Sequence, residues 1–356
     1  MEPFACENAN LTKNVNYFNS VCLTSFIYVV FYLCFHSNYY YLSSLKTKDR
    51  DTKRMLTSHT LFDTVGNTPL LRLAAIGKEL EGVELYAKAE YFNPTGSVKD
   101  RAAKAMIMDG IARGALTHDK TIIDATSGNT GIAYAALGAA LGYKVALCLP
   151  ANATEERKKL MKLYGAEIIE TDPLESSDGA YNECRRLFAE HSEKYFYPDQ
   201  YNNDANWKAH FDGTAVEIWE QTEHRVTHFV AGTGTSGTFM GTSRGLKHLN
   251  PQVKSVLMQP DSPFHGLEGM KHMASTIHPG FFDESIADVK LEVSTEEAYA
   301  MTRRLAHEEA LLVGISSGAN VAAALKLAKT LPPGSVVVTI LCDNGNRYLS
   351  AEFWEG

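Results

Sequence analysis

The chain has 356 residues, 45% of them hydrophobic and 21% charged, a composition typical of a globular protein with a large core. Its net charge is −8, and because residues 1–54 contain six basic and four acidic side chains, residues 55–356 carry a charge of −10. This acidic body argues against nucleic acid as a partner. The six cysteines are scattered without a C-x-x-C pair, which argues against a disulfide framework and a metal site. The length exceeds what one simple core accommodates, so we expect two lobes.

Residues 1–58 form an N-terminal extension that differs in pattern from the rest of the chain and need not belong to the fold. Its apolar segment, residues 21–35, is shorter than the roughly 18–20 residues that a membrane-spanning helix needs. It also lacks a basic n-region and a small-residue cleavage site, so we do not expect a cleaved secretory signal. We expect a cytoplasmic protein without a membrane role. The alternatives for the extension are a membrane anchor through residues 21–35, a targeting segment, or sequence upstream of a true start at Met55.

From Phe62 onward, apolar strands alternate with amphipathic helices. The pattern predicts strands at residues 83–89, 122–125, 144–149, 166–170, 226–230, 253–258 and 336–341. It predicts helices at residues 102–108, 132–141, 155–164, 207–221, 238–248, 294–309 and 319–330, the sixth of which opens with a capping box. This alternation predicts an α/β fold whose largely parallel sheet is covered by helices.

The stretch Asn-Pro-Thr-Gly-Ser-Val-Lys-Asp-Arg, residues 93–101, joins the strand at 83–89 to the helix that follows. It places Lys99 at the carboxyl end of a strand and the start of a helix, where open α/β sheets keep their ligand crevices. A lysine in this position suits a Schiff base. Taken alone, this stretch fits a solvated loop lysine equally well. The later loops decide between these two interpretations of Lys99.

Three further loops contain more Gly, Ser and Thr than a connection requires: residues 126–131, 232–238 and 314–319. The first, Thr-Ser-Gly-Asn-Thr-Gly, precedes a helix and predicts an anion site. The second lacks both the dinucleotide fingerprint and the P-loop lysine, so it predicts a cradle for one phosphate. The third, taken alone, fits a simple helix cap. Together with Lys99, these loops indicate pyridoxal 5′-phosphate (PLP), with the lysine for its aldehyde, the cradle for its phosphate and the remaining loops for an amino acid.

Residues 60–356 resemble the cysteine synthases (O-acetylserine sulfhydrylases) among the fold type II PLP enzymes. The ending Asp343–Ser350, D-x-G-x-R-Y-L-S, is similar to the B-type isozyme. The other matching motifs are Gly66–Leu70 (G-N-T-P-L), residues 93–101, residues 126–131, Gln200, His210–Trp219, residues 232–238 and Gly314–Ala319 (G-I-S-S-G-A). The resemblance implies a tryptophan synthase β-like α/β fold with two three-layer lobes and mostly parallel sheets. Residues 59–92 and 199–356 would form the larger, phosphate-binding lobe, and residues 93–198 the smaller, mobile substrate lobe.

The resemblance also implies roles for single residues. Lys99 would be the catalytic residue, which holds PLP as a Schiff base and later moves the Cα proton. The cofactor-binding residues would be Asn129 at the 3′ oxygen, Gly234, Thr235, Ser236, Gly237 and Thr238 at the phosphate, and Ser316 at the pyridine nitrogen. The substrate-binding residues would be Thr126, Ser127, Thr130 and Gln200 at the carboxylate, with Gly269 in the loop over the site.

The activity implied is β-replacement of O-acetyl-L-serine by sulfide, giving L-cysteine and acetate in an enzyme that forms homodimers. Threonine dehydratases and serine racemases differ in the lysine and glycine motifs. Cystathionine β-synthase shares the core, but because the sequence shows no regulatory domain after it, we do not expect that enzyme. Phosphoserine-using relatives carry an arginine where this chain has Asp261, an acid that would repel a phosphate. The second substrate stays open between sulfide, thiosulfate and another thiol. The non-enzyme alternative is a catalytically silent paralogue that binds serine acetyltransferase.

Overall fold

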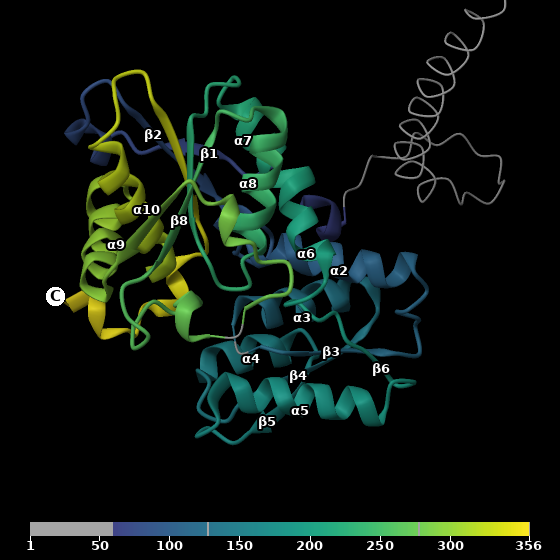
Figure 1. The fold of residues 1–356 in the computed structure, drawn as a ribbon. Coiled ribbons are helices and arrows are strands. Elements are labelled where there is room, and N and C mark those ends of the chain that lie inside the picture. The colour runs from purple at the N-terminus through teal and green to yellow at the C-terminus, as the bar shows by residue number, and fades with distance from the viewer. Residues whose placement is uncertain (1–59, 127, 277, 356) are drawn as a thin grey trace, which may run out of the picture. The chain divides into compact units, whose positions relative to one another are not determined.

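The computed structural model describes residues 60–126, 128–276 and 278–355 (Figure 1). The extension at residues 1–58, with its apolar segment 21–35, lies outside this range, so the predictions made for it are not tested. Among the helices of the described ranges, none is both long enough and apolar enough to cross a bilayer.

The helices and strands alternate along the chain as the sequence predicts. The strands are β1 (Leu70–Arg72), β2 (Glu84–Ala89), β3 (Thr121–Ala125), β4 (Lys144–Pro150), β5 (Glu167–Thr171), β6 (Tyr195–Phe196), β7 (His228–Gly232), β8 (Lys254–Pro260), β9 (Val289–Val293) and β10 (Val336–Leu341). The helices are α2 (Lys99–Ala112), α3 (Asn129–Leu141), α4 (Glu155–Leu163), α5 (Ser176–Glu190), α6 (Asp204–Ala209), α7 (Ala215–Gln221), α8 (Gly237–Leu249), α9 (Thr295–Glu309) and α10 (Ile315–Ala328).

The strands form two sheets. One is six-stranded in the order β1-β2-β10-β7-β8-β9, and the other is four-stranded in the order β5-β4-β3-β6. Strand β1 pairs with β2 antiparallel, and the other pairs in both sheets are parallel. Parallel strands are joined by crossover connections, usually helices, that pass over a face of the sheet. Both faces of a parallel sheet are therefore normally covered by helices. The predicted fold class, α/β with mostly parallel sheets, is confirmed.

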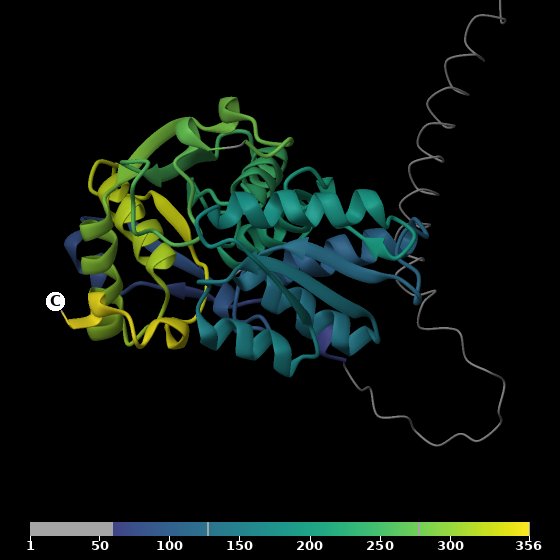
Figure 2. The same cartoon turned by 90° about the horizontal axis from the view of Figure 1, so that it is seen from below.

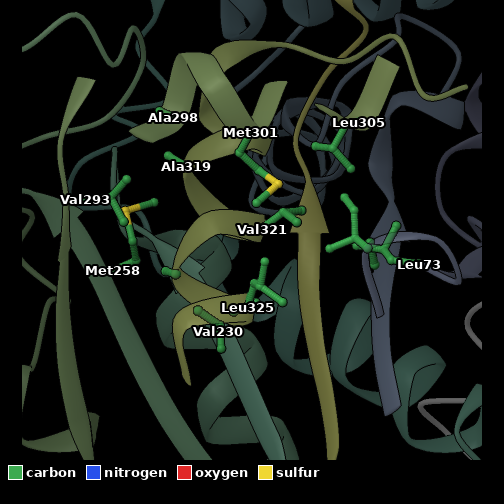
Figure 3. Packing of buried hydrophobic residues seen from close by; sticks show 14 of the residues in the cluster. Leu73, Val230, Met258, Val293, Ala298, Met301, Leu305, Ala319, Val321 and Leu325 are labelled. Carbon is green, nitrogen blue, oxygen red and sulfur yellow. The ribbon is translucent and has the colours of Figure 1, made fainter. Parts of the chain in front are cut away.

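The larger sheet is buried on both faces. Val230 and Val256 face α9 and α10, whereas their neighbours Phe229 and Leu257 pack with residues of α8. Figure 3 shows the first of these layers, in which Leu325 of α10 lies close to Val230 on β7. Burying one such aliphatic side chain contributes about 1.5–3 kcal/mol, so this layer supplies much of the stability of the fold.

The smaller sheet has the same three-layer arrangement (Figures 1 and 2). Ile122 and Val145 pack with residues of α2 and α3, whereas Ile123 and Ala146 pack with residues of α5. This sheet draws its strands from residues 121–196. The exact boundaries predicted for the two lobes stay a prediction.

The structure differs from the predicted elements in two ways. Helix α5 and strands β1, β6 and β9 were not predicted, and the helix expected at 207–221 is divided into α6 and α7 by a π-helical turn at His210–Thr214. Helix α8 crosses this region so closely that a Cβ atom at Gly241 would lie 2.0 Å from the carbonyl oxygen of Trp207. The close packing of α8 against this region therefore coincides with the π-helical turn. Residue periodicity in the sequence does not reveal such a local change in the helix.

Candidate active site

Lys99 is the first residue of α2, at the carboxyl edge of the larger sheet. The loop before it is held in place because Val98 N donates to Cys342 O at 2.8 Å, and Thr95 N donates to Asp100 Oδ2 at 2.7 Å. Gly96 has φ +82°, a left-handed conformation that favours glycine. Within the described residues, the Lys99 amine forms no ion pair. The fold therefore presents an uncommitted amine at the predicted position.

Arg101, two residues further along α2, belongs instead to a buried ionic cluster. Its Nε donates to Glu90 Oε2 and its Nη1 to Glu217 Oε1, each at 2.7 Å, and Lys88 Nζ lies 2.6 Å from Glu217 Oε2. Burial alone would raise the pKa of Glu217, but the hydrogen bonds and charge of Arg101, together with Lys88, lower it to about 2. This cluster is structural and holds the start of α2 against the sheet.

A cavity of about 330 Å³ opens at Lys99. It collects the predicted site residues from loops that are far apart in the chain. Ser127 lies outside the described residues, and the cavity is lined by all the other predicted site residues: Lys99, Thr126, Asn129, Thr130, Gln200, Gly234, Thr235, Ser236, Gly237, Thr238, Gly269 and Ser316.

The loop between β3 and α3 forms one wall of the cavity. Thr130 Oγ1 donates to Gln200 Oε1 at 3.3 Å, and Gln200 Nε2 lies 3.4 Å from Asp124 Oδ2 at the end of β3. These contacts fix the orientation of the Gln200 amide. Because the loop also lies at the N-terminus of α3, where backbone N–H groups point outward, the wall suits a carboxylate.

The loop between β7 and α8 forms a second wall. Ser236 adopts a left-handed conformation with φ +68° just before α8 begins. A Cβ atom at Gly234 would lie 2.5 Å from Gly269 O, and one at Gly237 would lie 2.0 Å from Asn206 Oδ1. Glycine is therefore required at both positions for the backbone to pack this tightly.

His210 supports this second loop from behind. Its Nε2 lies 3.3 Å from Thr238 Oγ1, and its Nδ1 lies 2.9 Å from Thr214 Oγ1. Burial, together with the positive charge of Arg101, lowers the pKa of His210 to about 3, so the ring is neutral at physiological pH. The histidine therefore supports the loop without adding a charge.

The third loop leads into α10 and places Ser316, which is 9% exposed, in the cavity. Asn320, one turn further on, accepts from Gly232 N at 2.8 Å and donates to Ile340 O at 3.0 Å. It thereby joins the ends of β7 and β10 beneath the cavity. Asn320 was not predicted as a site residue, and nothing in its sequence neighbourhood marks it.

Four charged or phenolic residues near the cavity were also missed. Arg157 from α4 forms an ion pair with Glu268, which lies in the loop after β8, and its guanidinium lies 5.6 Å from the centre of the Tyr348 ring. Asp343, which is 1% exposed, lies two residues after the end of β10 and accepts from the Tyr348 hydroxyl at 2.7 Å. For Asp343 a signal existed, because an acid just after a predicted buried strand lies at the ligand edge of the sheet.

Comparisons with known proteins agree with this geometry. Residues 61–343 match the family described as pyridoxal-phosphate dependent enzyme. The chain is 52% identical to the cysteine synthase of Aquifex aeolicus over 296 residues, which cover 82% of this chain and 90% of that protein. The chain belongs to the cysteine synthase family of pyridoxal-phosphate dependent enzymes. It is also 41% identical to cysteine synthase B of Salmonella typhimurium, with 82% of this chain and 95% of that protein covered.

The fold is similar to the crystal structure of O-acetyl serine sulfhydrylase isoform 3 from Entamoeba histolytica. The two superpose with a TM-score of 0.80 at 33% identity, covering 87% of this chain and 95% of that one. PLP is the cofactor of the family, so the predicted cofactor is confirmed. The similarity to a solved O-acetyl serine sulfhydrylase also confirms the predicted fold type II architecture.

The residues that line the cavity fit PLP. The hydroxyls of Thr233 and Ser236 are buried, with no hydrogen-bond partner among the described residues, at the positive N-terminal end of α8. Two unsatisfied hydroxyls beside backbone N–H groups suit a phosphate. The uncommitted amine of Lys99 lines the same cavity, and a volume of about 330 Å³ is within the range of small-molecule sites.

Asp124, behind this cavity, should make the stability of the enzyme depend on pH. Burial raises the pKa of its carboxyl from an ordinary 3.8 to about 7, against the lowering effect of the hydrogen bond from Ala125 N. The folded protein therefore holds a proton that the unfolded chain releases above pH 3.8. Consequently the free energy of unfolding falls as the pH rises from about 4 to about 7, by at most about 1.4 kcal/mol per pH unit.

Asp124→Asn should remove this slope, because an amide does not titrate. We expect the stability of wild type relative to the variant to decrease by a few kcal/mol (on the order of 1.4 kcal/mol per pH unit) between pH 4 and pH 7. Urea denaturation of both PLP-loaded proteins at several pH values measures the difference. A difference that stays constant across this range would show that Asp124 is ionised in the folded state.

Proposed function

We propose that this protein replaces the acetoxy group of O-acetyl-L-serine by sulfide, giving L-cysteine and acetate. The observation that carries the proposal is the meeting of Lys99, the loop before α3 and the loop before α8 around one cavity. Each suits a different part of a PLP–amino acid adduct: an amine for the reacting carbon, N–H groups and hydroxyls for the carboxylate, and a cradle for the phosphate.

The residues would divide the reaction as follows. When bound, PLP supplies an electron sink that stabilises negative charge at the substrate Cα. Lys99 Nζ would take the Cα proton and later return it. Thr126, Thr130 and Gln200 would hold the substrate carboxylate, with Ser127 joining them on the resemblance to the family. Drawing these groups onto the substrate would exclude water from the reacting carbon.

Other residues would hold the cofactor. Gly234, Thr235, Ser236, Gly237 and Thr238 would bind its phosphate, and Asn129 its 3′ oxygen. Ser316 would face its pyridine nitrogen. A serine hydroxyl cannot protonate the ring as a carboxylic acid would, so the electron sink is moderate. A moderate sink favours direct elimination of the leaving group over transamination.

The prediction that Asp261 repels a phosphorylated donor is not supported. Asp261 is exposed and is not among the residues that line the cavity. What supports an acetylated donor is the state of Arg157, the arginine that lines the cavity within the described ranges. Its guanidinium is already paired with Glu268 and is thus less available for a phosphate dianion. The named relatives, cysteine synthases and an O-acetyl serine sulfhydrylase, support the same donor.

A product assay with both donors tests the proposal. The PLP-loaded protein is given O-acetylserine or O-phosphoserine together with sulfide, thiosulfate or homocysteine, and the products are measured by chromatography. We expect L-cysteine from O-acetylserine and sulfide at the highest kcat/KM. Turnover of O-phosphoserine alone, or cystathionine as the main product, would favour one of the two alternative enzymes. No turnover with any pair would favour a catalytically silent paralogue.

The assembly and the location of the enzyme are two further proposals. A homodimer and a complex with serine acetyltransferase are proposed on the resemblance to the family alone. A cytoplasmic location is supported by the free thiols of Cys148, Cys184 and Cys342 in the described part of the chain, because disulfides are rare in that compartment.

A further inference from the structure

The side chain of Asn129 is held at both ends of its amide. Asn129 is the first residue of α3 and lines the cavity. Its Nδ2 donates to Asp343 Oδ2 at 2.7 Å, and its Oδ1 accepts from Arg347 Nη1. Both partners come from the segment just after β10, more than 200 residues away along the chain. The two contacts together distinguish the nitrogen end of the amide from the oxygen end.

A flipped amide would lose both contacts. An ionised carboxylate only accepts hydrogen bonds, and a guanidinium only donates them. Turning the Asn129 amide by half a turn would place its oxygen against the Asp343 carboxylate and its NH₂ group against Arg347. Because both hydrogen bonds are assisted by charge, each is stronger than a neutral one. The amide is therefore fixed in one orientation.

Asp343 and Arg347 are themselves fixed. Burial raises the pKa of Tyr348 well above its usual value, so its hydroxyl keeps its proton and donates to Asp343 Oδ2 at 2.7 Å. Arg347 Nη2 donates to Thr95 O in the loop that precedes Lys99. A Cβ atom at residue 314 would lie 2.1 Å from Asp343 Oδ1, so Gly314 makes room for the carboxylate. Neither partner of Asn129 is a freely moving surface side chain.

We propose that Asp343 and Arg347 are positioning residues that hold the Asn129 amide with its NH₂ group ready to donate to the 3′ oxygen of PLP. The inference rests on the proposed function, which assigns Asn129 to that oxygen. With one N–H given to Asp343, Nδ2 retains a second N–H, for which no partner exists among the described residues. A donor at the 3′ oxygen favours its deprotonated form, whereas a carbonyl oxygen turned toward it would favour the protonated form.

The absorption spectrum of the bound cofactor tests this proposal, because the two forms of the 3′ oxygen absorb at different wavelengths. The variants are Asn129→Ala, Asp343→Asn, the double variant of both, and Arg347→Met. The measurement is the ratio of the long-wavelength to the short-wavelength band of bound PLP. Asp119→Asn, an exposed aspartate after α2, is the matched control and should leave the ratio unchanged.

We expect Asp343→Asn to lower the band ratio by about tenfold, the effect of one charge-assisted hydrogen bond. Arg347→Met should lower it in the same direction. In the Asn129→Ala background, Asp343→Asn should have no further effect, because Asp343 acts through Asn129. Circular dichroism confirms that each variant is folded, and Arg347→Met carries the test if Asp343→Asn does not fold.

Two results would overturn the inference while leaving the proposed function intact. One is a shift in Asn129→Ala without any shift in Asp343→Asn or Arg347→Met. The other is an equal effect of Asp343→Asn in the presence and absence of the Asn129 side chain. An unchanged band ratio in Asn129→Ala would instead remove Asn129 from the 3′ oxygen, and both the assignment and the inference would fail.

Discussion

Replacing Lys99 by alanine should abolish cysteine formation almost completely, with kcat reduced at least about 1,000-fold. General acid–base catalysis by one side chain contributes about 100- to 10,000-fold, and Lys99 would also hold the cofactor. The buried Lys88 cannot replace it, because its amine is bound within the ionic cluster with Glu217. The measurement is the rate of cysteine formation from O-acetylserine and sulfide at saturating PLP.

Lys104→Ala is the matched control for this variant. Lys104 lies on the same helix, α2, but its Nζ donates to Phe62 O at 2.8 Å, away from the cavity. We expect it to lower thermal stability and to leave kcat within about twofold of wild type, because it contacts neither cofactor nor substrate. A Lys99→Ala protein that retained more than one tenth of wild-type kcat would contradict the role given to Lys99.

The second large effect is expected at Glu217. Glu217→Ala should reduce the free energy of unfolding by about 3–5 kcal/mol, because it leaves the buried cluster of Arg101, Lys88 and Glu90 with one uncompensated positive charge. Arg101 is 5% exposed and Lys88 0% exposed in these pairs, so water cannot replace the lost partner. Urea denaturation of the PLP-loaded protein at pH 7 measures the loss.

Glu190→Ala provides the matched comparison, since Glu190 also pairs with an arginine, at 2.6 Å, but with both side chains about half exposed. An exposed pair contributes about 0–1 kcal/mol. The pH dependence has a defined sign as well. The pKa of Glu217 lies near 2 instead of the ordinary 4.5, so its contribution is complete above pH 4.5 and is lost as the pH falls toward 2. Equal losses for Glu217→Ala and Glu190→Ala would show that the cluster does not stabilise the fold.

The parts of the site that the sequence could predict are those encoded locally. Each loop at 93–101, 126–131 and 232–238 lies directly between a strand and a helix, so its position at the ligand edge follows from the α/β pattern. The glycines at 234 and 237 mark a tightly packed backbone, and the structure contains that packing. For these loops, residue type and position together were sufficient.

The parts that could not be predicted depend on contacts between distant segments. Asp343 meets Asn129 across 214 residues, although Asp343 comes after β10 of the larger sheet and Asn129 comes after β3 of the smaller one. Residue periodicity does not show how two sheets are arranged relative to each other. The pair of Arg157 and Glu268 likewise joins α4 to a loop 111 residues later. Asp261 shows the converse error, since an acid next to a strand end in sequence is exposed outside the cavity.

The most direct measurement of the central claim is to locate the lysine that carries the cofactor. Borohydride reduction of the PLP-loaded protein fixes PLP covalently to the lysine that holds it, and mass spectrometry of the digested protein identifies that residue. Two lysines line the cavity within the described ranges, Lys99 and Lys271. We predict the label on Lys99. Label on Lys271, or on a lysine outside the cavity, would contradict the account.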